Sequence, residues 1–111
     1  MNLPKRIQIG YRIYRVEVAH ELGIDDDCGS HNCVRGLLRL NPHLDAQETA
    51  NTLLHEILHG VVRTQGIALP TEEEERIVNT LSNGLAAVMV QNPGLMADIE
   101  ALLREPLDSP P

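Results

Sequence analysis

Residues 45–66 read DAQETANTLLHEILHGVVRTQG, and this stretch decides the fold. Asp45 with Glu48 three residues later is the pattern of a helix N-cap and its capping-box partner, and Gly66 is a typical helix stop. We therefore expect a helix over residues 46–65. Its apolar residues recur at helical spacing and are expected to face the core: Ala50, Leu53, Leu54, Ile57, Leu58, Val61 and Val62.

The opposite flank of this helix is polar and carries His55-Glu56-Ile57-Leu58-His59, the pattern H-E-x-x-H. Residues i and i+4 of a helix lie about 6 Å apart, so both imidazoles can bind one zinc ion. Glu56 leans toward the same side, where a carboxylate can take a proton from an activated water. The pattern predicts a zinc site for amide hydrolysis, with His55 and His59 as ligands and Glu56 as general base. The alternative is a solvated polar flank that binds nothing.

A catalytic zinc needs three protein ligands and one open position, so a further ligand must come from another element. Residues 66–70 form a short connection to a second helix, which predicts that the two helices are antiparallel neighbours. Four consecutive glutamates at residues 72–75 open that second helix. Glu75 lies at nearly the same level as His59, which favours it as the third ligand. Glu74 lies nearer the centre of the apolar stripe, so both glutamates remain candidates.

The front of the chain is rich in strand patterns. Polar and apolar residues mostly alternate over residues 6–18, which indicates half-buried strand with Gly10 as a bulge or a bend. Residues 22–32 are rich in turn formers and predict a loop. A further strand is expected over residues 34–40, ending at Asn41-Pro42 and pairing antiparallel with the first strand region.

Two more helices are expected in the back half of the chain. Thr71 with Glu74 three residues later predicts a second capping box, and the helix that it opens is expected to end near residue 91. Asn92 as N-cap with Pro93 at the first helical position predicts a third helix that ends near Arg104. The apolar residues of this third helix are expected to cover the core: Leu95, Ile99, Leu102 and Leu103.

A helix with H-E-x-x-H followed by a second helix with Glu75-Arg76-Ile77-Val78-Asn79 resembles a minimal gluzincin metallopeptidase. The similarity is closer to the ImmA/IrrE-like and phage-encoded zincin-like peptidases, and it covers about residues 34–92. Their second motif reads roughly E-x-x-A-[ND]-x-F-A, and here Val78 and Leu81 stand in place of the Ala and the Phe.

This resemblance implies a set of site residues and an activity. The zinc ligands would be His55, His59 and Glu75, the general base Glu56, and Asn79 would steady the metal site from behind the ligands. The implied activity is zinc-dependent hydrolysis of a peptide bond in a protein or peptide substrate, in a phage or mobile-element context. The alternative function is a non-catalytic metal-binding or protein-interaction domain that keeps the zincin shape.

The elements and the resemblance together predict an α+β fold with a minimal zincin-like plan. We expect a short antiparallel sheet packed on the H-E-x-x-H helix, with two further helices. One metallopeptidase domain is expected over residues 1–105, followed by a Pro-rich tail at residues 106–111. The 111 residues suffice for one domain and are too few for a second.

Composition excludes several classes of partner. The chain carries nine basic and sixteen acidic residues, and only three of the basic ones lie in residues 41–111. Nucleic acid is not expected as a partner, because counterion release requires clustered Lys and Arg. The longest apolar run covers six residues, 85–90, too few to cross a membrane, and no export signal is visible at the start. We expect a cytoplasmic protein, and the oligomeric state is left open.

No residue is singled out by spacing as a stabiliser of the oxyanion. Five side chains are candidates if their strands or loops border the open zinc face: Tyr11, Tyr14, His20, His31 and His43. Cys28 and Cys33 are expected to be free thiols in a loop rather than a second metal site with His31.

Overall fold

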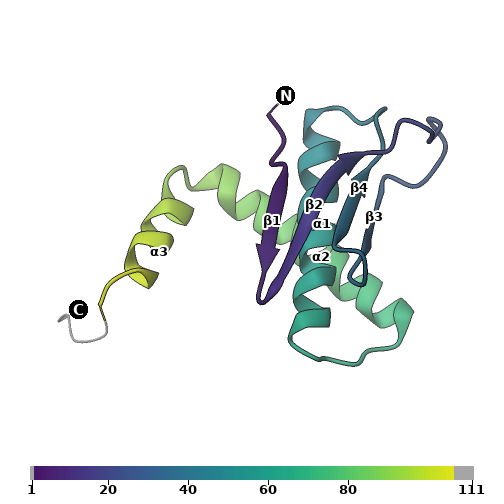
Figure 1. Cartoon of the computed structure of the whole chain (residues 1–111). Coiled ribbons are helices and arrows are strands. Elements are labelled where there is room, and N and C mark those ends of the chain that lie inside the picture. Colours follow the sequence, from purple (N-terminus) through teal and green to yellow (C-terminus); the bar gives the residue numbers. More distant parts are fainter. Residues whose placement is uncertain (1, 107–111) are drawn as a thin grey trace.

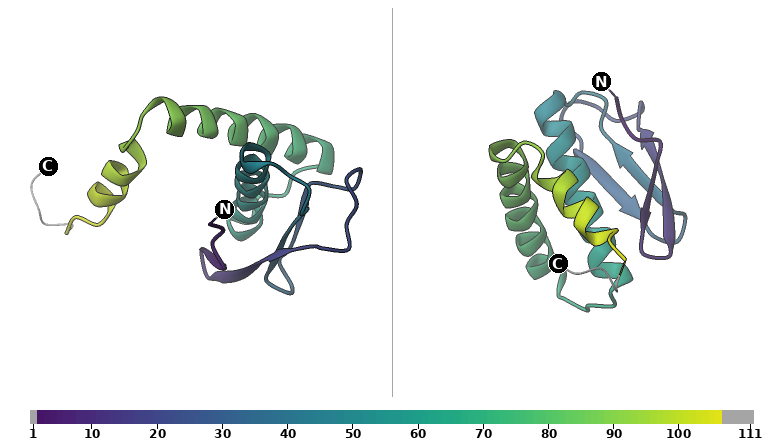
Figure 2. Two further views of the ribbon diagram at one scale, coloured as in Figure 1. Left: turned by 90° about the horizontal axis from the view of Figure 1, so that it is seen from above. Right: turned by 90° about the vertical axis from the view of Figure 1, so that its left-hand side faces the viewer.

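A four-stranded sheet lies against one side of a central helix, and a second helix crosses the other side (Figures 1 and 2). The computed structural model describes residues 2–106. Within them the elements follow one another as β1 (Arg6–Ile9), β2 (Arg12–Val18), β3 (Gly29–Asn32), β4 (Leu37–Leu40), α1 (Ala46–Thr64), α2 (Thr71–Gln91) and α3 (Leu95–Leu103). The protein is therefore a small α+β domain, as the sequence predicts.

The alternating segment at the front folds into a hairpin rather than one strand. β1 and β2 pair antiparallel, with Arg6 opposite Arg15 and Ile9 opposite Arg12. The turn between them contains Gly10, whose φ of +60° lies in the left-handed region that favours glycine. Gly10 is thus the bend between two strands.

The sheet is mixed, whereas the sequence predicts an antiparallel one. Its order is β1-β2-β4-β3, and β4 pairs parallel with β2 and antiparallel with β3. The loop predicted over residues 22–32 contains β3, which was missed because Gly29-Ser30-His31-Asn32 has little strand propensity. This edge strand runs back along the sheet, so β4 returns in the direction of β2. β4 is also shorter than the predicted 34–40.

The central helix α1 has the bounds and the cap that the sequence predicts. The backbone N–H of Glu48 donates to the Asp45 carboxylate at 2.8 Å, and the Glu48 carboxylate accepts from the Asp45 N–H. The hydrogen bond from the Glu48 N–H lowers the pKa of Asp45 below its usual 3.8. Gly60 allows a close approach to the sheet, because a Cβ there would lie 2.7 Å from Ile9 Cδ1.

The buried apolar core lies between the sheet and α1. It is formed by Ile9, Tyr14 and Leu38, with Leu53 and Ile57 of α1 packed against them. The predicted apolar stripe of α1 is therefore only partly buried, and Val61 is 37% exposed.

The second and third helices begin differently from the predictions. α2 ends at Gln91 as expected, but it begins at Thr71 without a side-chain cap, so the predicted second capping box is wrong. α3 begins after Gly94, whose φ is +86°, instead of at Pro93. Within the part of the chain that the structure describes, no helix combines the length and the apolar character needed to cross a lipid bilayer.

The prediction that the third helix covers the core is also wrong. α2 has 21 residues and spans about 31 Å, so it runs past α1 and carries α3 away from the sheet (Figure 2). None of the residues of α3 is buried. The Pro-rich tail predicted at residues 106–111 lies, from residue 107 onward, outside the described residues.

Candidate metal centre

The H-E-x-x-H flank of α1 is buried, although its polar character suggested a solvent-facing side. Glu56 is 5% exposed and His59 is 4% exposed. Strand β3 covers this flank from the sheet side and α2 covers it from the other side. Glu56 and His59 are therefore not solvated as the alternative expected, because two elements distant in sequence pack over them.

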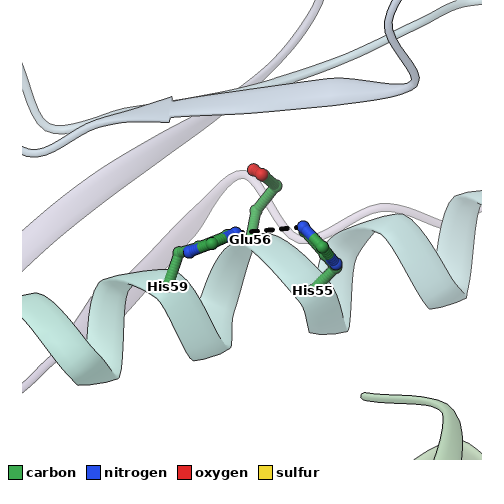
Figure 3. Close-up of side chains that lie close together, drawn as sticks. All are labelled: His55, Glu56 and His59. Atoms are coloured by element: carbon green, nitrogen blue, oxygen red, sulfur yellow. Dashed lines mark hydrogen bonds between the residues drawn. The ribbon is translucent and has the colours of Figure 1, made fainter. Parts of the chain in front are cut away.

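Figure 3 shows the two imidazole rings of the motif facing each other across one turn of α1. His55 Nε2 and His59 Nε2 are 3.0 Å apart. The carboxylate of Glu75, near the start of α2, reaches both: its Oε1 is 2.6 Å from His59 Nε2 and its Oε2 is 3.3 Å from His55 Nε2. The structure thus brings together the three residues that the sequence names as ligands.

Glu74 lies on the other side of the His59 ring. Its Oε2 is 2.6 Å from His59 Nδ1, and both residues are buried. A carboxylate in this position accepts the Nδ1 hydrogen and leaves the Nε2 lone pair facing His55 and Glu75. The two candidate glutamates therefore occupy different positions, one on each ring nitrogen of His59. The position of Glu74 near the centre of the α2 stripe was the signal in the sequence for its burial.

The donor set suits a cation. With its hydrogen on Nδ1, the neutral His59 ring presents a lone pair at Nε2, 2.6 Å from a Glu75 oxygen. Two acceptors this close repel each other unless a positive species, a proton or a metal ion, lies between them. Tetrahedral zinc bonds of about 2.0–2.1 Å hold ligand atoms about 3.3 Å apart. The separations of 3.3 Å and 3.0 Å are close to this value, whereas the 2.6 Å between Glu75 Oε1 and His59 Nε2 is shorter. The side chain of Glu75 is 49% exposed and has room to make the small adjustment.

Glu56 points away from the two rings and toward the sheet (Figure 3). Its Oε2 is buried and has no hydrogen-bond partner among residues 2–106. A buried carboxylate oxygen without a partner costs about 1–3 kcal/mol or more, which indicates that a water or a ligand group belongs beside it.

His31 of β3 is the one of the five candidate side chains that the structure places against Glu56. Its Nδ1 lies 3.7 Å from Glu56 Oε2, and its ring stacks on that of His59 with centroids 5.3 Å apart. Tyr14 lies instead in the core, where burial raises its pKa above the usual 10.0. Tyr11 is 83% exposed at the hairpin turn. His20 and His43 are exposed in loops.

A cleft of about 650 Å³ opens over this cluster. Its walls come from β3, the end of α1, the α1–α2 connection and the first turn of α2, and it includes His31, Glu56, His59, Arg63, Glu74 and Glu75. Asn79 lines a second hollow beside His55, and within residues 2–106 no hydrogen bond joins its side chain to either histidine. Cys28 and Cys33 are free thiols, as expected.

The ligand atoms of His55, Glu56 and His59 lie within 4.8 Å of one another, so this group can hold a metal ion. The contacts of Glu75 with both Nε2 atoms place a fourth side chain at the same point. Comparisons with protein-family models, with curated proteins and with solved structures gave no match to this chain.

Proposed function

We propose that this protein is a zinc-dependent metallopeptidase with a minimal zincin-like fold. The observation that carries the proposal is that the three glutamates near His59 have different contacts. Glu75 meets the Nε2 atoms of both histidines, Glu74 takes the opposite ring nitrogen, and Glu56 remains buried and unpaired beside them. A purely structural metal site has no use for this last carboxylate.

In this proposal His55, His59 and Glu75 hold zinc and leave one position open. Zinc in such a site lowers the pKa of a water ligand and polarises a substrate carbonyl. Glu56 accepts the proton at its unpaired Oε2 and passes it to the leaving amine. Its burial strengthens this role, because a carboxylate held away from bulk water has few competing partners.

Two more residues keep the reacting groups in place. Glu74 holds the hydrogen of His59 on Nδ1, so that Nε2 stays free as a donor to zinc. His31 stands beside Glu56, from where an imidazole N–H can donate to the carboxylate or to a developing oxyanion in the cleft. The cleft of about 650 Å³ lies within the usual size of ligand sites, and it accommodates a short stretch of a peptide.

The substrate class follows from the chemistry together with the resemblance to ImmA/IrrE-like peptidases. Amide hydrolysis is one of the reactions that a zinc ion and a carboxylate base would support. We therefore propose a protein or peptide substrate.

The test is Glu56→Gln beside the wild type. Gln has nearly the same shape, so the variant should keep its zinc content while losing cleavage of a mixed peptide library. The control is Glu72→Gln, which removes one charge from an exposed residue of α2 and should leave both unchanged. Zinc binding without cleavage in the wild type would support the non-catalytic metal-binding domain instead. Failure of the wild type to bind zinc would refute both proposals.

A further inference from the structure

The end of α2 and all of α3 form a projecting apolar arm, defined here as residues 84–103 (Figures 1 and 2). α2 leaves α1 at Asn83, whose side-chain oxygen accepts a hydrogen bond from Asn51 at 3.0 Å. Beyond that point no described residue of the arm is buried. Seven large apolar side chains of the arm are 40–80% exposed: Val88, Met89, Val90, Met96, Ile99, Leu102 and Leu103.

Exposure of these apolar side chains to water is energetically unfavourable. α3 has nine residues, fewer than the roughly 12–15 that an isolated helix needs for marginal stability. Most helices of this length are stabilised by packing of their apolar face, and within residues 2–106 α3 packs neither on the sheet nor on α1. Seven exposed large apolar side chains within 20 residues indicate an interaction surface.

We propose that a second copy of this chain covers the arm. Two arms related by a two-fold axis would pack their four helical segments into a bundle, so that the apolar side chains of each arm are covered by those of the other. This inference is independent of the zinc site, because it concerns the opposite end of α2.

The exposed apolar area of the arm is comparable with the apolar area of a standard dimer interface. The free energy of burying one large aliphatic side chain corresponds to about 100 Å² of apolar surface. With about half of that still exposed on each of the seven, the arm presents roughly 400 Å². A standard interface buries about 800 Å² per partner, of which roughly 450 Å² is apolar. Complete cover of all seven side chains would therefore bring one arm close to the apolar area of a standard interface, though slightly below it.

The distribution of charge permits contact between two copies and disfavours an anionic lipid surface. The chain has a net charge of −7, yet only Asp98 and Glu100 are charged within the arm. Contact between two arms therefore leaves the acidic parts of both chains at a distance, where salt screens their repulsion. The arm has no Lys or Arg, so it lacks the basic face with which amphipathic helices bind anionic lipid.

Arm-to-arm contact would leave the candidate metal centre open. Glu75 and Val90 are separated by fifteen residues of α2, about 22 Å along the helix axis. Each copy would therefore keep its own cleft free for substrate.

The experiment is measurement of molar mass by light scattering during gel filtration of the full chain. The chain mass is 12.3 kDa, so the wild type is expected at about twice that value. Leu103→Glu, at a site 80% exposed, should weaken the dimer by about 30-fold or more and yield the monomer mass at low micromolar concentration. Val34→Glu is the matched control, because Val34 is 86% exposed in the β3–β4 turn, and it should remain dimeric.

Helical circular dichroism and zinc content of the variants show whether the domain itself stays folded. A wild-type monomer at 100 μM would overturn the proposal, and so would a folded Leu103→Glu that stays dimeric. A monomer that co-sediments with neutral phosphatidylcholine vesicles would replace the second copy by a lipid surface.

Discussion

Replacing Glu74 and Glu75 separately by Gln should produce different losses, although the two residues are adjacent in sequence. Glu75 meets the Nε2 atoms of both histidines, while Glu74 meets only Nδ1 of His59. The total binding free energy of a structural zinc is about 10–16 kcal/mol over four ligands, or roughly 2.5–4 kcal/mol for each. Glu75→Gln keeps a neutral oxygen in place of a charged one, so we expect zinc affinity to fall by at least about 100-fold.

Glu74→Gln should act on both the metal and the fold. Loss of an acceptor behind a ligating histidine typically lowers metal affinity by about 10–100-fold. Glu74 and His59 are also buried, so the charged hydrogen bond at 2.6 Å is replaced by a neutral one. This should lower the free energy of unfolding of the metal-free protein by about 1 kcal/mol.

Both effects are measurable on the same samples. Competition with a chromophoric chelator at pH 7 gives the zinc affinity, and urea unfolding in EDTA gives the metal-free stability. Glu72→Gln controls for loss of one charge in the first turn of α2. A greater loss of affinity in Glu74→Gln than in Glu75→Gln would assign the ligand to Glu74. Wild-type affinity in both variants would refute the placement of the third ligand on α2.

Three further predictions concern the packing and ionisation of the fold. Gly60→Ala should lower the free energy of unfolding by about 1–3 kcal/mol, because its Cβ would lie 2.7 Å from Ile9 Cδ1. Gly84→Ala places its Cβ in open space and should raise the free energy of unfolding by about 1 kcal/mol. Urea titration measures both values, and equal effects of the two substitutions would contradict the close packing at Gly60. For Asp45 the folded-state pKa is the lower one, so the charged cap stabilises the protein above about pH 3.8 and this is lost as pH falls through the lowered pKa. The stability difference between the wild type and Asp45→Asn should therefore shrink on acidification, and a difference independent of pH would be inconsistent with the cap. Tyr14 has a raised pKa and a buried hydroxyl without a hydrogen-bond partner among the described residues. The neutral side chain therefore stabilises the fold below pH 10.0, and this stabilisation is lost as the pH rises through the raised pKa. At pH 7 the free energy of unfolding of Tyr14→Phe should equal that of the wild type or exceed it by up to about 1 kcal/mol, and the loss of stability at alkaline pH should disappear. A lower stability of the variant at pH 7 would show that the hydroxyl makes a hydrogen bond.

The parts of this fold that depend on local interactions could be predicted from the sequence. The capping box of α1 involves Asp45 and Glu48 only, three residues apart, and the structure contains both of its hydrogen bonds. The level of Glu75 beside His59 follows from a short connection and the rise of a helix, and the two side chains are in contact. Such inferences succeed because few other parts of the chain influence them.

The features that depend on the path of the whole chain could not be predicted in this way. β3 has the residues of a turn, and it becomes a strand only because β4 provides a row of backbone partners beside it. The direction of β4 relative to β2 depends in turn on β3. Burial of Glu56 and His59 required both β3 and the start of α2, neither of which is part of the helical pattern of α1.

The composition of α2 changes along its length from charged to uncharged residues, and its burial also changes along its length. Glu74 and Glu75, near its start, contact a histidine of α1, whereas residues 77–91 contain no charged side chain. Three residues of α2 are buried, Glu74, Val78 and Ser82, and no described residue of α2 beyond Asn83 is buried. A helix needed only to complete the metal centre would gain nothing from extending as an apolar arm beyond that point, since exposed apolar surface is unfavourable in water. The arm of a second copy, as proposed above, would remove this surface from water.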